Sequence, residues 1–271
     1  MPTGMNLKPE KAPVAEDVTG RPVLLDLTAV FAIMAGAAFL LFRNVFALWW
    51  GFDDSFILAT VLFQPLEDMF VHPEVYRTFS MVNFTPLVIL SYAVDYHVFG
   101  FDPLGFYVHQ VVAMAAVSAA IFVLAGRWHK GAALWAALLF LLTGPSAVGA
   151  HILAMRHYVE GALWVLLAGI LLPSPGKSIG RAWAAASLYL LACLSKEIYV
   201  PFGLAPFFLV QGSLRRRCVI SLPFWIALVG YSLWRIHMLG GLGLQGYGNL
   251  WWIHWQSWDL NRTGRSWIPA Y

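Results

Sequence analysis

The sequence predicts an all-α, polytopic membrane protein, because it is very apolar and poor in charge. Of its 271 residues 60% are hydrophobic and only 11% are charged, whereas soluble domains carry about 25% charged residues. The mean hydropathy is +0.69. At least five stretches approach the roughly 20 apolar residues that a helix needs to cross a bilayer. We therefore expect a helical bundle of about seven transmembrane helices, with two interfacial helices in its first outer loop.

The N-terminal part of the chain divides into a polar tail and a first apolar run. Residues 1–21 mix lysines with acidic residues and are expected to form a cytoplasmic tail. Pro22 suits the first position of a helix, and residues 23–48 are apolar for long enough to span. The transmembrane module is expected over residues 22–239. Residues 240–271, rich in Gly and Trp, are expected to form a separate aromatic segment on the outer face.

A long connection of mixed character, residues 49–102, follows the first predicted span. Loops that merely join helices are usually much shorter. Residues 56–63 have the apolar content of a short helix lying on the membrane surface. The length of this loop and its own amphipathic pieces favour a functional role for it.

Residues 85–99 form the second apolar piece of this loop and could be either a span or an interfacial helix. They are few for a span, and Asp95 and His97 interrupt them. Counting them as a span would place Arg127 and Lys130 outside, against the positive-inside tendency. We therefore expect an interfacial helix here.

Six further spans are expected after the outer loop. A single span over residues 181–210 would bury Lys196 and Glu197 near the middle of the bilayer, which is costly. Two short spans joined at these residues avoid that cost. The predicted spans are 104–126, 131–148, 159–172, 181–195, 198–212 and 218–239.

This topology separates the charges to the two sides of the membrane. Ten of the 17 basic residues fall on the cytoplasmic side, and ten of the 14 acidic residues fall on the other. Such a bias sets membrane orientation, and it places the acidic chemistry outside. We expect a multi-pass protein, in a bacterial inner membrane, with a cytoplasmic N-terminus and an active face in the periplasm. The basic residues are Lys8, Lys11, Arg21, Arg127, Lys130, Lys177, Arg181, Arg215, Arg216 and Arg217.

Two adjacent carboxylates, Asp53 and Asp54, stand at the outer end of the first predicted span. A carboxylate in partly apolar surroundings has a raised pKa and can serve as a general base. The alternative is that both simply end a helix and face water. Adjacent carboxylates are also compatible with the binding of a divalent cation, although no cofactor and no metal site are predicted.

Basic residues are expected on the same outer face as this acidic pair. Lys196 lies at the apex of a predicted hairpin, and Arg156 and His157 lie at the mouth of another span. Such side chains can hold a phosphate through charge-assisted hydrogen bonds. The alternative is a set of internal ion pairs, Lys196 with Glu197 or Arg156 with Glu160. His109, also near this face, is expected to be a hydrogen-bonding residue, since its spacing matches no standard metal motif.

Taken together, these features resemble the polytopic glycosyltransferases of the GT-C fold, which include the protein O-mannosyltransferases and the lipid A aminoarabinose transferases. The resemblance covers roughly residues 22–248 and corresponds to the N-terminal module of those enzymes. It rests on motifs in a set order, namely Phe52–Asp54, Phe84–Leu87, Val98–Phe106, Ser195–Glu197 with Pro201, and Trp234–Arg235 followed by Gly240–Gly241.

The resemblance implies a transferase that moves a sugar from a polyprenyl-phosphate donor to a lipid or protein acceptor on the periplasmic or lumenal face. Asp53 would then act as the acceptor-side base, with Asp54 supporting it. The donor phosphate would be neutralised by basic side chains in a low-dielectric site. The candidates for that role are Arg156, Lys196 and Arg235, with Glu197, His157 and His109 as supporting residues.

The sequence is also compatible with two other functions. One is a non-catalytic membrane protein that binds a lipid carrier or serves as a partner subunit. The other is a small transporter, in which Asp95, Lys196 and Glu197 would line a path through the bilayer. Side chains that converge on one outer cavity would favour the enzyme. Basic residues are not interleaved with aromatic ones as in nucleic-acid-binding surfaces, so no nucleic-acid partner is expected.

Overall fold

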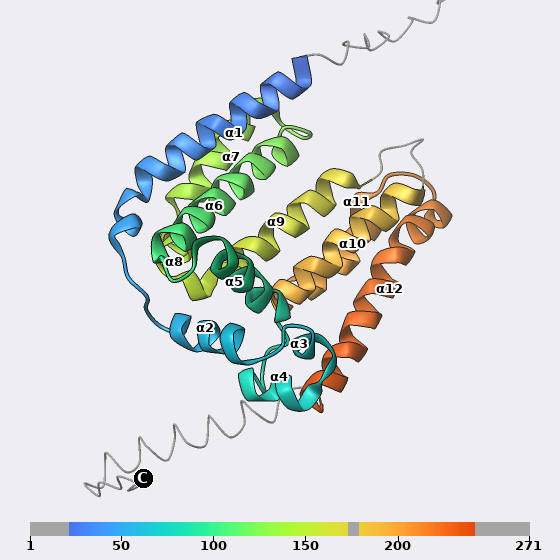
Figure 1. Ribbon diagram of the computed structural model, residues 1–271. Helices are drawn as coiled ribbons and strands as arrows, with labels where there is room; N and C mark the ends of the chain where they lie inside the picture. The colour runs from blue at the N-terminus through green and yellow to red at the C-terminus, as the bar shows by residue number, and fades with distance from the viewer. Residues whose placement is uncertain (1–21, 173–178, 242–271) are drawn as a thin grey trace, which may run out of the picture.

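The computed structural model describes residues 22–172 and 179–241. Within these ranges every regular element is a helix, which confirms the all-α prediction. Figure 1 shows long helices lying alongside one another, with several short helices gathered at one end. The predicted tail 1–21 and nearly all of the predicted segment 240–271 lie outside the described residues.

The long segments follow the predicted order of spans. The bounds are α1 (Pro22–Leu41), α6 (Pro103–Ala125), α7 (Lys130–Leu142) with α8 (Gly144–His151), α9 (Arg156–Leu171), α10 (Ile179–Ser195), η3 (Glu197–Leu204) with α11 (Ala205–Leu209), and α12 (Leu214–Leu239). In the described ranges only α6 and α12 are long and apolar enough to cross a membrane, or three segments if α7 and α8 count as one span. The structure therefore supports a membrane helical protein with two or three candidate spans.

Two of the predicted spans are not single straight helices. The segment predicted at 131–148 divides into α7 and α8, which are bent by 54°. The bend follows Thr143, whose hydroxyl oxygen accepts a hydrogen bond from the Ser146 N–H, and Pro145 then begins the new helix. The segment predicted at 198–212 is a 3₁₀-helix, η3, followed by the short α11, because Pro201 and Pro206 cannot supply the N–H groups of a continuous α-helix.

The predicted break at Lys196 is confirmed. Its backbone is extended, with φ −157° and ψ 135°, between the end of α10 and the start of η3. The first predicted span is also shorter than expected. α1 ends at Leu41, and a 3₁₀-helix, η1 (Arg43–Ala47), follows it.

The outer loop contains the two predicted helices and two more. α2 (Asp54–Phe63) and α5 (Pro86–Phe99) match the predicted pieces, whereas α3 (Asp68–Val71) and α4 (Pro73–Phe79) were not expected from the sequence. Both additional helices are too short to show an apolar periodicity. Figure 1 shows all four at the end of the bundle where α12 finishes.

Contacts to the C-terminal end of α12 fix α3 and α4. The indole of Trp234 donates a hydrogen bond of 2.9 Å to the carbonyl oxygen of Phe70. The guanidinium of Arg77 donates to the carbonyl oxygens of Met238, at 2.9 Å, and His237, at 3.1 Å. Carbonyls in the last turn of a helix lack helical partners, so Arg77 caps α12.

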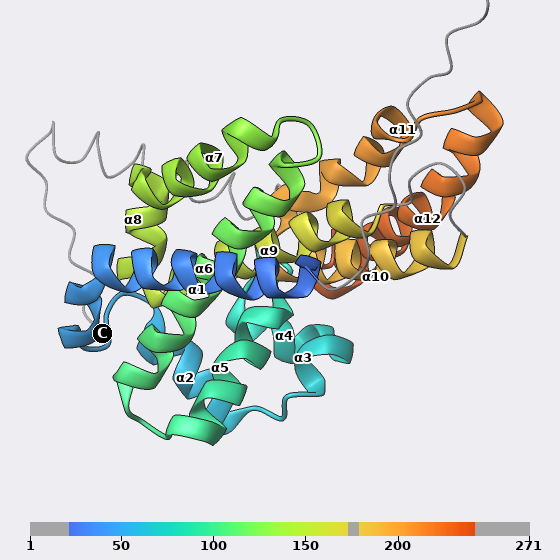
Figure 2. The same cartoon turned by 90° about the horizontal axis from the view of Figure 1, so that it is seen from above.

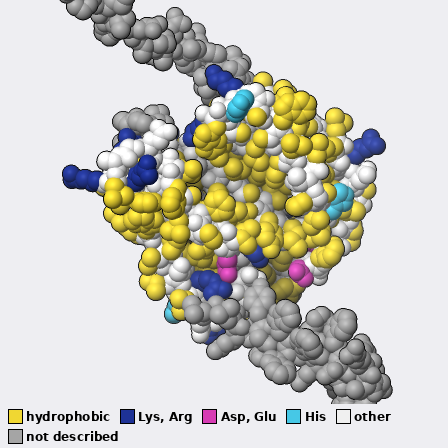
Figure 3. Space-filling view, turned by 180° about the vertical axis from the view of Figure 1, so that it is seen from behind, with side chains coloured by type: hydrophobic (Ala, Val, Ile, Leu, Met, Phe, Trp, Pro, Cys, Tyr) yellow, Lys and Arg dark blue, Asp and Glu magenta, His cyan; other side chains and the backbone are white. Residues whose placement is uncertain are grey.

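α1 and α7 both pack against α6 and touch each other, α9 packs against α6 and α10, and α10 also packs against α12. Figure 2 shows the bundle from above. One large core joins these helices to α2, α4 and α5. Hydrophobic side chains also cover most of the face seen in Figure 3. A surface of this kind fits contact with lipid rather than with water.

The bundle has a basic end. Arg127 follows α6 and donates a hydrogen bond of 3.0 Å to the carbonyl oxygen of Gly169, near the end of α9. Lys130 begins α7, Arg181 lies in the first turn of α10, and α12 starts with three arginines, 215–217. The acidic pair Asp53 and Asp54 lies at the start of α2, at the opposite end of the bundle (Figure 1).

Two helical glycines provide a test of the packing. A methyl group at Gly161 would lie 2.2 Å from Cε2 of the Tyr199 ring, whereas one at Gly230 would meet no atom within 4 Å. We expect Gly161→Ala to destabilise the protein by about 1–3 kcal/mol through overpacking. Gly230→Ala, the matched control, should leave stability unchanged or raise it by up to about 1 kcal/mol. Thermal unfolding in detergent measures both, and equal effects would contradict the α9–η3 packing.

Candidate functional site

A tight turn at the start of α2 sends the two adjacent carboxylates in different directions. Phe52 has a φ of 48°, a left-handed conformation that is uncommon for any residue other than glycine. The backbone N–H of Gly51 donates a hydrogen bond of 2.9 Å to Oδ2 of Asp54. Asp54 is therefore turned inward and buried, while Asp53 stays exposed.

Asp54 is held inside by α5 as well. The hydroxyl of Tyr92 donates a hydrogen bond of 2.8 Å to Oδ1 of Asp54. Burial raises the pKa of Asp54, although the hydrogen bonds from Gly51 and Tyr92 and the nearby charge of Arg156 oppose that shift. Because Asp54 is buried and bonded through both oxygens, its evident role is to fix the turn that presents Asp53.

Asp53, His157 and Lys196 line one pocket of about 360 Å³. They come from the start of α2, the first turn of α9 and the break before η3, which lie far apart in the sequence. Among the described residues, neither Asp53 nor Lys196 is in an ion pair, so this pocket brings together an anion and a cation without ionic partners. The other lining residues are Phe56, Ile57, Phe79, Ser80, Asn83, Thr85, Val88, Ala154, Met155 and Tyr158.

Lys196 and His157 both lie against the ring of Tyr158. The Nζ atom of Lys196 is 4.9 Å from the centre of this ring, within the range of a cation–π interaction. The His157 ring lies 4.5 Å from it, and its two nitrogens have no hydrogen-bond partner among the described residues. Lys196 is the only Lys or Arg among the residues that line this pocket.

The sequence analysis missed the aromatic and amide side chains of this pocket. The rings of Phe56 and Phe79 stack with centres 5.6 Å apart, and they form a wall between α2 and α4. Ser80 and Asn83 add polar groups from the loop after α4. No local signal in the sequence marks these four residues, because the pocket exists only where α2 and α4 meet α9.

A second cavity, of about 670 Å³, adjoins the first and is almost wholly apolar. It is lined by residues of α6, α7, α8, α9 and η3, among them Met114, Phe140 and Ala162. Met155 and Tyr158 line both cavities. A polar pocket and an apolar cavity thus share a wall, an arrangement that suits a ligand with a charged head and an apolar chain.

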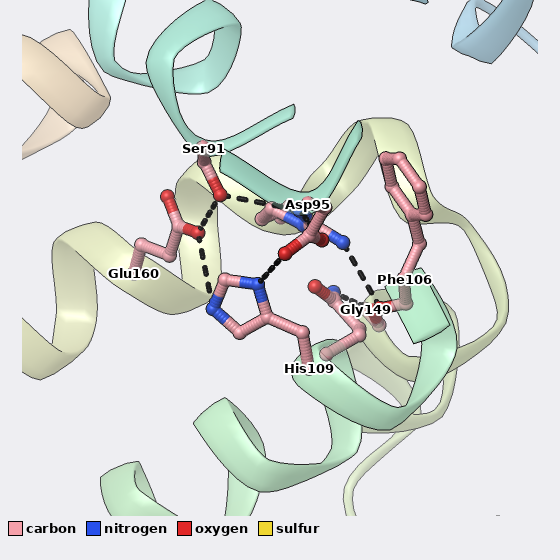
Figure 4. A network of polar contacts seen from close by, with 8 residues as sticks. Ser91, Asp95, Phe106, His109, Gly149 and Glu160 are labelled. Atoms are coloured by element: carbon pink, nitrogen blue, oxygen red, sulfur yellow. Dashed lines mark hydrogen bonds and ion pairs between the residues drawn. The ribbon is translucent and has the colours of Figure 1, made fainter. Parts of the chain in front are cut away.

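Arg156 does not reach the polar pocket, although the sequence analysis assigned it to a donor phosphate. Its side chain is fully buried, and its guanidinium pairs with Asp95 and donates to Ser91 Oγ at 3.2 Å and to the carbonyl oxygen of Phe106 at 3.0 Å. Figure 4 shows three of its partners, Ser91, Asp95 and Phe106, within this network. A guanidinium enclosed in this way cannot also bind a ligand phosphate.

Arg235 and Glu197 form another internal pair. Nε of Arg235 lies 2.7 Å from Oε1 of Glu197, and its Nη2 donates to the carbonyl oxygen of Val82. The same Glu197 oxygen accepts a hydrogen bond of 2.7 Å from the Phe84 N–H. These contacts fix the loop after α4 against α12 and η3. Glu197 therefore pairs with Arg235 and not with its sequence neighbour Lys196.

The predicted site residues thus fall into three groups. Asp53, His157 and Lys196 meet in the pocket, with Asp54 directly behind it. Glu197 and Arg235 support its rim. Arg156 and His109 belong to a buried network with Asp95 and Glu160. Among the described residues no three His, Cys, Asp or Glu side chains are arranged to hold a metal ion.

Comparison of the chain with known proteins identifies no relative. No protein-family model matches the chain, and no curated protein or solved structure is significantly similar to it. The resemblance to GT-C glycosyltransferases therefore stays a prediction from sequence motifs.

Proposed function

We propose that the protein is a membrane glycosyltransferase that moves a sugar from a polyprenyl-phosphate donor to an acceptor hydroxyl. The observation that carries this proposal is the shared wall between the polar pocket and the apolar cavity, formed by Met155 and Tyr158. A lipid-linked phosphosugar has the two chemical parts that this pair of cavities suits. The motif order described above supports the same reading.

The donor would bind across both cavities. Its phosphate lies at Lys196, which has no carboxylate partner among the described residues, and its apolar chain lies in the cavity beside Ala162. Arg156 and Arg235 contribute indirectly, since each is already paired with a carboxylate. Lys196 is consequently the candidate that stabilises the charge of the leaving phosphate.

Asp53 would act as the base on the acceptor side. Its carboxylate takes the proton of the acceptor hydroxyl while that oxygen bonds to the anomeric carbon of the sugar. The bond from that carbon to the phosphate oxygen breaks, and the lipid phosphate leaves with the electron pair. Asp54 maintains the turn that presents Asp53, through its bonds to Gly51 and Tyr92.

The charge distribution supports an orientation for this reaction. The basic end, with Arg127, Arg181 and residues 215–217, would face the cytoplasm under the positive-inside rule. The pocket then opens on the periplasmic or lumenal side, with α1, α6, α7–α8, α9, α10, η3–α11 and α12 as seven crossings. The shorter segments would cross where neighbouring helices enclose them and satisfy their irregular backbone.

Release of polyprenyl phosphate from a panel of polyprenyl-phosphate sugars tests the assignment. With membrane extract as the source of acceptor, Asp53→Asn should lose about 10²–10⁴-fold in turnover, the usual contribution of a general base. Lys196→Ala should lose activity as well. The matched controls are Glu74→Gln, an exposed acid, and Lys130→Ala, an exposed cation at the opposite end.

Three outcomes of that experiment are informative. Turnover that depends on Asp53 and Lys196 supports the transferase. Donor binding that depends on Lys196 without any turnover indicates a lipid-carrier-binding protein instead. Donor that neither binds nor turns over would refute both functions.

Narrowing the apolar cavity tests the position of the lipid chain. Ala162→Phe places a ring among the residues that line this cavity. We expect KM to rise about tenfold or more for a long-chain donor and to change little for a short-chain one, because only the long chain needs the space. Ala132→Phe, at an exposed position on α7, is the control. An equal effect on donors of both lengths would show that the chain binds elsewhere.

A further inference from the structure

The loop between α4 and α5, residues 80–85, has no regular secondary structure, yet side chains hold its backbone. The N–H and the carbonyl group of Val82, of Asn83 and of Phe84 are all hydrogen-bonded. A peptide group that is bonded on both sides to packed side chains is not free to turn. These bonds therefore fix the middle of the loop in one conformation. The partners are Ser80, Tyr76, Arg235, Glu197 and Tyr231.

Asn83 is held through its backbone alone. Its N–H donates a hydrogen bond of 3.1 Å to Oγ of Ser80, and its carbonyl oxygen accepts one of 2.7 Å from the Tyr76 hydroxyl. Asn83 lines the polar pocket, but its side-chain amide has no hydrogen-bond partner among the described residues. An amide has two N–H donors and a carbonyl acceptor. A rigid loop thus holds an unused donor and an unused acceptor at the wall of the pocket.

The other polar side chains that this loop adds to the pocket are Ser80 and Thr85. Oγ of Ser80 already accepts hydrogen bonds from two backbone N–H groups of the loop, at 3.3 Å and 3.1 Å. Thr85 is buried. Asn83 is therefore the residue of this loop whose side chain remains available to a ligand.

The proposed reaction requires the sugar to lie in this part of the pocket. The phosphate lies at Lys196 and the acceptor hydroxyl at Asp53, and the anomeric carbon exchanges its bond to the first for a bond to the second. The sugar ring must then contact the remaining wall, which includes Asn83 and the stacked rings of Phe56 and Phe79. An apolar surface with a few fixed polar groups is the usual form of a specific small-molecule site.

We propose that Asn83 selects the donor sugar, and that its amide binds two adjacent hydroxyl groups of that sugar. The amide N–H donates to the oxygen of one hydroxyl, and the amide carbonyl accepts from the other hydroxyl. A sugar that lacks either hydroxyl, or holds it in another configuration, leaves one of these groups unpaired and binds less well. The inference rests on the proposed function for the presence of a sugar, but its test does not require turnover.

The affinity of the full chain for matched lipids, measured in detergent micelles, provides the test. The probes are polyprenyl phosphates that carry glucose, mannose, galactose or arabinose, and polyprenyl methyl phosphate, which has the same phosphodiester charge but no sugar. The unmodified protein should bind at least one sugar-bearing lipid more tightly than the methyl ester. Asn83→Ala should weaken binding of that lipid about tenfold or more, through the loss of two hydrogen bonds, and should bind the methyl ester as before.

The structure also provides the controls. All the bonds that fix residues 82–84 involve backbone groups of these residues, so Asn83→Ala should keep the thermal unfolding temperature of the unmodified protein. Asn44→Ala, at an exposed position in η1, is the matched control and should bind every probe like the unmodified protein.

Deoxy forms of the preferred sugar identify the hydroxyl pair. At two adjacent positions, removal of the hydroxyl should weaken binding to the unmodified protein but cause little further loss in Asn83→Ala, because the same bonds are already absent. Losses that add fully in the variant at every position would contradict the assignment.

The outcomes separate this inference from the proposed function. Equal affinity of Asn83→Ala and the unmodified protein for the preferred lipid would overturn the inference, and so would an equal loss for that lipid and the methyl ester. An unmodified protein that binds all probes alike, or none, would also overturn it. Turnover that depends on Asp53 would still support the transferase in those cases. Sugar-specific binding that depends on Asn83, without turnover, would support the sugar site and reject the transferase.

Discussion

The burial of the Arg156 guanidinium is the constraint on which the rest of the outer end depends. A buried cation must be paired and hydrogen-bonded, and the partners of Arg156 come from α5 and from the first turn of α6. These contacts fix three helices at one point, together with the rings of Tyr92 and Phe106 that lie over the guanidinium. Removing Asp95 alone would leave an unpaired buried charge, which costs more than the pair itself contributes.

The polar pocket is a consequence of this anchor. Because Arg156 points into the network, the next two residues of α9, His157 and Tyr158, lie along the pocket wall. Tyr92, packed on the guanidinium, holds Asp54 and so the turn that exposes Asp53. The charged residues that were predicted to form one site therefore have two different roles. Some of them hold the helices together, and the others remain available to a ligand.

The proposed function depends on the difference between the polar pocket and the apolar cavity that adjoins it. The pocket holds an anion and a cation that lack ionic partners among the described residues, whereas the cavity beyond Met155 and Tyr158 is apolar. An amphiphilic ligand would place its charged head in the pocket and its apolar chain in the cavity. Of the residues that a transporter path would use, Asp95 pairs with Arg156 and Glu197 pairs with Arg235.

The sequence by itself determined the helical class, the order of the long segments, the break at Lys196 and the helices at residues 56–63 and 85–99. These features follow from local properties, namely runs of apolar residues and the cost of burying charge. The bend between α7 and α8 and the irregular η3 also have local causes, namely the cap at Thr143 and the prolines Pro145, Pro201 and Pro206, which the predicted spans did not take into account. Only the tertiary structure decided the division of the charged residues into pocket and network. Arg156 and Asp95 are paired across 61 positions, and hydropathy along a chain carries no information about which distant charges meet when helices pack.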